Sequence, residues 1–86
     1  MDKPATPANF AQLIDLWPEK PGSSVRNFAI DLDVPYVTAQ LMRYRNNVHP
    51  RHWAKLVEAA KRRRLVGIDM GLLATLAQER ALERAS

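Results

Sequence analysis

The stretch Phe28-Ala29-Ile30-Asp31-Leu32-Asp33-Val34-Pro35-Tyr36-Val37-Thr38-Ala39-Gln40-Leu41-Met42 decides the fold. Before the break at Asp33-Val34-Pro35, apolar residues recur at i, i+3, i+4 and i+7, which is the spacing of one helix face. After the break, the segment to residue 45 has few apolar positions that can point inward, namely Ala39 and Met42. The pattern therefore predicts two short helices joined by a tight turn, the second with its outer face free.

Two helices of this length, joined by three or four residues, are the plan of a helix-turn-helix unit. Its second helix can enter the major groove of DNA if its outer face has no part in the core. The small side chain of Ala29 lets the two helices cross closely, and Val34 fills the turn. The sequence therefore meets the packing requirements of such a unit over about residues 24–45.

This stretch resembles the helix-turn-helix of the Cro/phage-repressor (Xre-type) regulators. In that family an alanine of the first helix is followed by a turn glycine, a hydrophobic residue, and later apolar residues that match Ala39 and Met42. The segment Asn46-Asn47-Val48-His49-Pro50-Arg51-His52-Trp53, continued to Arg64, is also similar to small Cro-like regulators of phages and bacteria. The resemblance covers about residues 10–66. It departs at Asp33, where the family has the turn glycine, and aspartate is among the least costly substitutes in a left-handed conformation.

The resemblance implies an all-α, lambda-repressor-like fold of five short helices. It implies a sequence-specific regulator of transcription, usually a repressor, that binds an inverted repeat in double-stranded DNA as a homodimer. It also implies which residues face the DNA. The bases would be read by Tyr36, Val37, Gln40, Leu41 and Tyr44, and phosphate would be touched by Ser24 and Arg26.

The chemistry of the same residues points to DNA independently. Gln40 can form paired hydrogen bonds with adenine, while Val37 and Leu41 can contact thymine methyl groups. Arginine, lysine, asparagine and tyrosine side chains bind phosphate oxygens. The predicted contacts of this kind are Arg43, Tyr44, Arg45, Asn47, Arg51 and Lys55.

The positive charge of the chain lies in one block. The 86 residues have a net charge of +4, but residues 43–64 hold eight lysines and arginines against Glu58 alone, a net charge of +7. A basic face centred on the second helix of the motif and the loop after it is therefore expected, with a polyanion as its partner.

The rest of the chain reads as three further helices. We expect a first helix capped by Thr6, with Pro7 at its first position, and ended by Pro18. Ser23 or Ser24 can cap the second, Pro50 opens a fourth that ends near residues 66–67, and Asp69 caps a fifth. The expected organisation is a flexible N-terminus (1–5), a DNA-binding domain (6–66) and a C-terminal helix (67–86).

The last helix has a wide apolar arc that can serve in one of two ways. It can pair with a second copy across a two-fold axis, with the interface at Leu72, Leu73, Leu76 and Ala77. Alternatively, it folds back and completes the core of its own chain.

Other functions have little support in the sequence. The chain has no cysteine, and His49 and His52 have no third ligand nearby, so we expect no metal. The carboxylates are scattered, so we expect no enzyme, cofactor or small-molecule ligand. No apolar run approaches the about 18 residues of a membrane span, and no signal core opens the chain, so we expect a cytoplasmic protein, associated with the nucleoid when bound to DNA.

Two alternatives remain open. Val37 and Leu41 are unusual on a base-reading face, and they favour a helical protein-interaction module, an antirepressor or adaptor that keeps the fold without base readout. An RNA-binding helical domain is less favoured, because a helix cannot easily enter the narrow major groove of duplex RNA.

Overall fold

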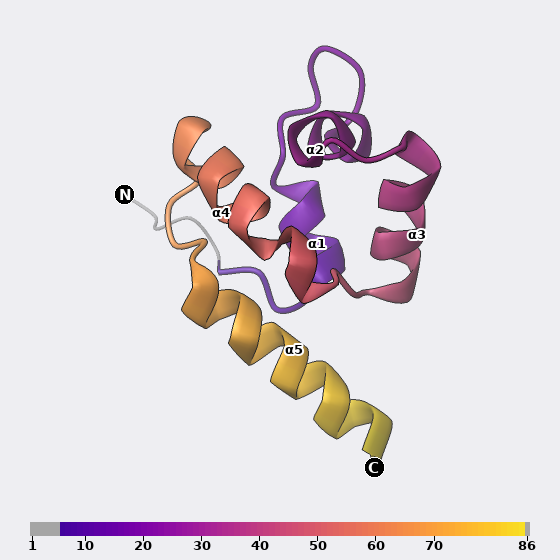
Figure 1. Cartoon of the computed structure of the whole chain (residues 1–86), viewed down its shortest axis with the longest axis vertical. Coiled ribbons are helices and arrows are strands. Elements are labelled where there is room, and N and C mark those ends of the chain that lie inside the picture. The colour runs from indigo at the N-terminus through magenta and orange to yellow at the C-terminus, as the bar shows by residue number, and fades with distance from the viewer. Residues whose placement is uncertain (1–5, 86) are drawn as a thin grey trace.

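The computed structural model describes residues 6–85, with side chains to residue 82, and this range contains helices and no strand. The elements are α1 (Phe10–Asp15), α2 (Ser24–Leu32), α3 (Tyr36–Arg45), the 3₁₀ turn η1 (Pro50–His52), α4 (Trp53–Arg62) and α5 (Met70–Ala85) (Figure 1). The predicted all-α class is confirmed for this range. The expectation of a flexible segment at residues 1–5 lies outside the described residues.

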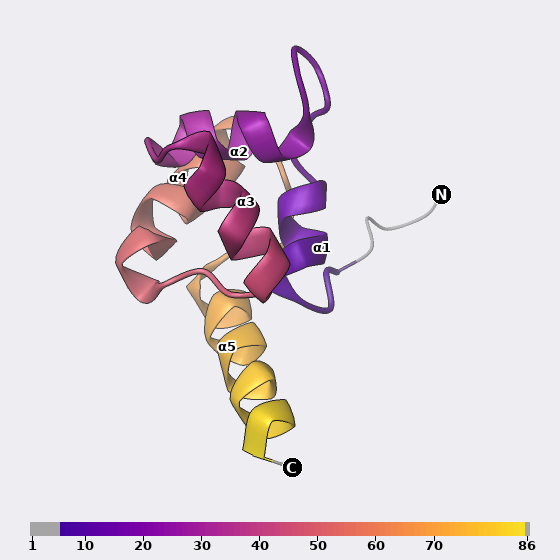
Figure 2. The same cartoon turned by 90° about the vertical axis from the view of Figure 1, so that its right-hand side faces the viewer.

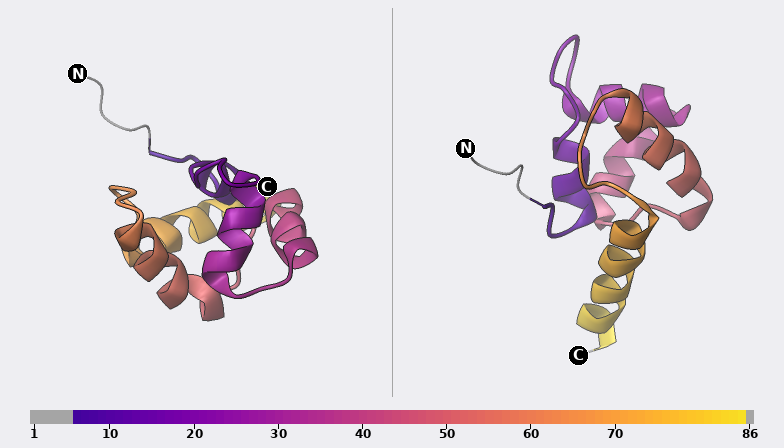
Figure 3. Two further views of the ribbon diagram at one scale, coloured as in Figure 1. Left: turned by 90° about the horizontal axis from the view of Figure 1, so that it is seen from above. Right: turned by 90° about the vertical axis from the view of Figure 1, so that its left-hand side faces the viewer.

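The first four α-helices form the body of the molecule, and α5 extends away from it. Helices α1, α2 and α3 pack against one another, α4 packs against α2, and α5 contacts α4. Figure 2 shows the C-terminal part of α5 projecting beyond the body. Seen from above, α3 lies at the edge of the body, with α4 on the opposite side of α2 (Figure 3). This position at the edge leaves one side of α3 without a neighbouring helix.

The core draws side chains from all five α-helices. Trp17 is fully buried, and its ring meets that of Phe28 edge to face at 4.9 Å. Trp53 lies at the margin of the core, half-buried, and its indole N–H donates to the carbonyl of Val48 at 2.9 Å. The buried hydrophobic residues are Phe10, Leu13, Ile14, Trp17, Phe28, Ala29, Leu32, Ala39, Met42, Val48, Leu56, Ala59, Ala60, Ile68, Leu73 and Leu76.

The helix starts confirm two predicted caps and correct a third. The Ser23 hydroxyl accepts from the N–H of Arg26, and the Asp69 carboxylate accepts from the N–H of Leu72 at 2.8 Å. For α1 the cap is Asn9 and not Thr6, because the Asn9 side chain accepts from the N–H of Gln12 at 2.8 Å. This helix also ends at Asp15, before the predicted stop at residue 18.

Helices α2, α3 and α4 end in the same way. A residue with positive φ that is not glycine stands directly after α2 (Asp33, 57°) and α3 (Asn46, 55°), and one residue further on after α4 (Arg64, 59°). The N–H of the residue after it donates to the carbonyl five residues earlier, as from Val34 to Ala29 at 3.0 Å. This arrangement satisfies carbonyls that the helix itself leaves unpaired. The left-handed turn expected at Asp33 is therefore present, and α4 stops at Arg62, several residues before its predicted end.

Helix α5 completes the core of its own chain. Leu73 is 0% exposed and Leu76 is 4% exposed, and both belong to the core cluster. Leu72 and Ala77 pack against that cluster. The four residues expected at a dimer interface therefore face inward, which is the alternative that the sequence left open. The predicted dimer interface is therefore wrong, because the apolar arc of α5 packs against α4 and its surroundings. Sequence periodicity shows that a helix has an apolar face but not which surface that face covers.

We predict that Leu73→Glu unfolds the domain, because an unpaired charge would enter a site that excludes water. Ala74→Glu is the matched control, since Ala74 is the neighbouring residue and is exposed. Thermal unfolding followed by circular dichroism should show no cooperative transition for the first variant and a free-energy change within about 0.5 kcal/mol for the second. A stable, folded Leu73→Glu variant would contradict the place of α5 in the core.

Candidate nucleic-acid interface

Five side chains share the exposed side of α3, because only Ala39 and Met42 of this helix are buried. We call this side the outer face of α3. It is strongly exposed at Val37 (59%) and Tyr44 (86%). Its members are Tyr36, Val37, Gln40, Leu41 and Tyr44, so the structure brings together all five residues predicted to read bases.

One edge of the outer face lies against the start of α2. Val25 of α2 lines a shallow hollow together with Gln40 and Tyr44. The Arg26 guanidinium lies over the Tyr36 ring, 4.8 Å from its centre, and Arg26 is exposed. This cation–π contact holds a positive charge beside the first turn of α3.

Ser24 does not offer a donor at this edge. Its hydroxyl donates its single hydrogen to the carbonyl of Trp17 at 2.7 Å, and the residue is half-buried. The predicted phosphate contact by Ser24 therefore needs this hydrogen bond to break. The sequence could not reveal this hydrogen bond, because it joins α2 to the chain after α1 and depends on how these two segments pack together.

The other edge of the outer face is a cavity of about 270 Å³, which we call the basic notch. Arg45 and Leu41 belong to α3, and the loop and the 3₁₀ turn after it supply the opposite wall. No carboxylate is among the described residues that line it. They are Thr38, Leu41, Met42, Arg45, Asn47, His49, Arg51 and His52.

Arg43 is not a free cation. Its guanidinium donates two hydrogen bonds to the Asp15 carboxylate, each 2.8 Å long, and so ties α3 to α1. The hydrogen bond and the positive charge of Arg43 lower the pKa of Asp15 despite partial burial. The predicted phosphate contact by Arg43 must therefore compete with this ion pair. Lys55, also predicted, has its ammonium 3.9 Å from the Asp33 carboxylate, and both groups are exposed.

The basic block of the sequence is divided in space. Arg45 and Arg51 lie at the basic notch, next to α3. Lys61, Arg62 and Arg64 are at the far end of α4, which runs away from α3 (Figure 1). The basic face expected around α3 is therefore smaller than the charge block suggests. The sequence alone could not separate these two groups of basic residues, because the direction of α4 is fixed by its packing on α2.

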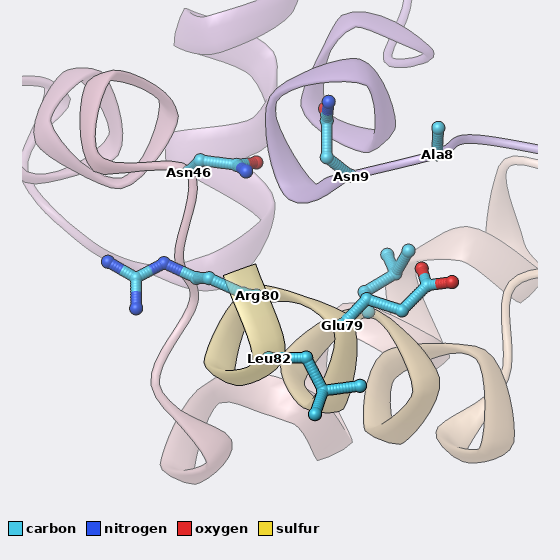
Figure 4. Close-up of a pocket in the computed structure, with 7 residues that line it drawn as sticks. Ala8, Asn9, Asn46, Glu79, Arg80 and Leu82 are labelled. Atoms are coloured by element: carbon cyan, nitrogen blue, oxygen red, sulfur yellow. The ribbon is translucent and has the colours of Figure 1, made fainter. Parts of the chain in front are cut away.

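Another hollow lies between α5, the start of α1 and the end of α3 (Figure 4). Its polar groups are mostly engaged within the chain. The Asn46 side chain accepts from the N–H of Ala11 at 3.0 Å, and Arg80 donates twice to the carbonyl of Arg45, at 3.3 Å each. These bonds fasten the end of α3 to α1 and α5, a role for Arg80 that no sequence signal indicated.

Asp31 joins three segments of the fold, and no pattern in the sequence pointed to this role. Its carboxylate accepts from the indole N–H of Trp17 at 2.8 Å and from the guanidinium of Arg63, with one contact of 3.0 Å. Burial alone would raise the pKa of Asp31, but these hydrogen bonds and the charges of Arg63 and Arg62 outweigh it, so the pKa is lowered. Asp31 is thus held ionised at neutral pH.

Compared with models of protein families, with curated proteins and with solved structures, the chain has no match. None of the helices described here combines the length and the apolar character that crossing a membrane requires. Within residues 6–82, no three histidine or carboxylate side chains gather as ligands for a metal ion.

We predict that Asp31→Asn costs about 1.5–3 kcal/mol of unfolding free energy at neutral pH, since it removes a charged hydrogen-bond acceptor that is 10% exposed. The folded-state pKa of Asp31 is lowered, so its contribution is present above the ordinary value of 3.8 and is lost as the pH falls through the folded value. Urea unfolding at neutral pH and near about pH 3 should therefore show a smaller difference between wild type and variant in acid.

The matched control is Asp15→Asn, which also breaks an arginine–carboxylate pair, but one with side chains 46% and 47% exposed. Such an exposed pair contributes at most about 1 kcal/mol. Equal losses in the two variants would contradict the structural role of Asp31.

Proposed function

We propose that this chain is a sequence-specific regulator of transcription that binds double-stranded DNA with α3 in the major groove. In this proposal α2, the turn at residues 33–35 and α3 are a helix-turn-helix unit of a lambda-repressor-like domain. The observation that carries it is the outer face of α3, which is exposed between an edge with Arg26 and an edge with the basic notch. An α-helix is about 10–12 Å wide and the major groove about 12 Å, so cations at both edges face the two phosphate backbones.

The residues then divide into two roles. Gln40 pairs with adenine, and Val37 and Leu41 contact thymine methyl groups. Arg26, on one side, and Arg45, Asn47 and Arg51, on the other, bind phosphates and set the orientation of the helix. Lys55, in the first turn of α4, makes a further phosphate contact. One unit contacts only a few base pairs, so we propose a homodimer on an inverted repeat that acts as a repressor. Its interface lies outside the buried leucines of α5.

The second candidate is a protein-interaction module. Its support is the apolar character of the outer face of α3, where Val37, Leu41 and both tyrosines are exposed and Gln40 is the one amide. Exposed apolar patches of this kind mark contact surfaces. Measurements with DNA separate the two candidates.

We predict that Arg51→Ala with Lys55→Ala weakens binding to duplex DNA of any sequence. Each lost phosphate contact should reduce the slope of log affinity against log salt by about 0.9. The matched control is Lys61→Ala with Arg62→Ala, which removes the same charge from the far end of α4 and should change the slope little. Fluorescence anisotropy with a labelled duplex over a salt series measures both. Equal slopes in the two double variants would show that the charge near α3 has no special part in binding.

We predict that Gln40→Ala weakens specific binding by about 1–3 kcal/mol and relaxes the preference at one base position, because a paired hydrogen bond to a base is lost. Affinities for the preferred site and its single-base variants measure this. Gln78→Ala, at an exposed position of α5, is the control and should change neither. If Gln40→Ala ranks the base variants as the wild type does, Gln40 reads no base.

A further inference from the structure

Both histidines of the chain lie in the basic notch. The sequence contains two, and His49 and His52 both line the cavity together with Arg45 and Arg51. Histidine is the side chain whose ordinary pKa lies near physiological pH. The notch therefore brings imidazole rings next to two guanidinium groups.

Each imidazole accepts a hydrogen bond from Arg51. The Nδ1 atom of His49 accepts from the backbone N–H of Arg51 at 3.1 Å and so begins the 3₁₀ turn. The Nε2 atom of His52 faces the Nε–H of the Arg51 side chain at 3.4 Å, a long contact. A nitrogen that accepts a hydrogen bond carries no proton. Protonation of His52 at Nε2 would place two donors opposite each other, unless an acceptor came between them.

The surroundings of His52 disfavour a positive charge on the ring. Burial, the charge of Arg51, the imidazole of His49 and the charge of Lys55 all lower its pKa. Across the notch, α3 contributes another cation, Arg45, and no carboxylate lines the cavity among the described residues. The Asp33 carboxylate lies 3.9 Å from the Lys55 ammonium and is not part of the lining. An anion in the notch would therefore have hydrogen-bond donors on several sides, and no carboxylate would compete with it for them.

We propose that the basic notch binds one phosphate group and that His52 takes up a proton from solvent when it binds. The phosphate oxygens accept from Arg51 and from the newly protonated Nε2 of His52, so the two donors no longer oppose each other. This inference rests on the proposed function, with a DNA phosphodiester as the expected source of the group. Free phosphate shares the chemistry, and the experiment distinguishes the two.

The proton uptake fixes the sign of the pH dependence. A bound anion raises the pKa of His52 above its value in the free chain. Affinity is therefore constant well above the pKa of the complex, increases as the pH falls, and becomes constant again below the pKa of the free chain. A phosphodiester has no titration in this range, so the change comes from the protein.

The test measures the affinity for a short duplex at about pH 7.5 and about pH 5.5, at constant ionic strength. The wild type should bind about threefold to tenfold tighter at the lower pH, since one proton gives at most about tenfold for each pH unit. His52→Gln, which keeps a polar side chain and cannot titrate here, should bind equally at both. Lys61→Gln, at the far end of α4, is the control outside the notch and should retain the pH dependence. A pH effect that persists in His52→Gln overturns the proposal.

A second arm follows the His52 imidazole of the wild type by NMR, with sulfate as a tetrahedral anion that does not titrate in this range. This arm needs no variant. If sulfate and duplex both move the His52 titration to higher pH, the notch accepts a free phosphate-like anion. If only the duplex moves it, the site is specific to the nucleic-acid backbone. A titration that neither probe moves overturns the proposal. Failure of duplex binding at every pH contradicts the proposed function instead, and the sulfate arm then decides the inference alone.

Discussion

The left-handed turn at Asp33 is the constraint on which the rest of the site depends. The N–H of Val34 donates to the carbonyl of Ala29 at 3.0 Å, and this bond ends α2 and redirects the chain into α3. Ala29 and Ala39 are both buried, and their small side chains let α2 and α3 pack closely. Because α3 is then anchored through Ala39 and Met42, five of its ten residues form the outer face. A different turn would rotate α3 and bury part of that face.

Two arginines of the basic block fasten helices together, and the others remain at the surface. Arg63 binds the half-buried Asp31, while Arg43 binds Asp15 and joins α3 to α1. These pairs explain why the charge near α3 is lower than the sequence suggests. The cations that remain beside α3 are divided between its two edges, with Arg26 on one and Arg45 and Arg51 on the other. A charge pattern in a sequence thus has to be separated into internal ion pairs and free cations before it supports a nucleic-acid partner.

Local signals in the sequence predicted much of the fold. Helix faces follow from apolar spacing, and the caps Ser23 and Asp69 act within three residues of the groups that they satisfy. Asp33 was also predictable, since few residues accept a left-handed conformation. The predicted start of α1 was wrong because Thr6 and Asn9 are both good cap residues, and the helix begins after the second of them.

Contacts between segments that are far apart in the chain could not be predicted from the sequence. The hydrogen bond from Ser24 to Trp17, the pair of Asp31 with Arg63 and the burial of Leu73 all depend on how helices meet in space. For the candidate site, helical periodicity correctly grouped the five residues of the outer face of α3. It did not reveal that Arg43 is engaged, nor that both histidines lie in one notch with Arg45.

Recognition of DNA by α3 can be tested by selection of bound sequences from random duplex DNA, because this selection assumes no particular binding sequence. If α3 reads the major groove, a short motif should be enriched as an inverted repeat, with its half-sites separated by about one helical turn. Footprinting of the selected site should then show protection of the major groove in each half-site. Recovery of no sequence above background would contradict DNA recognition by α3 and would favour a protein partner for its outer face.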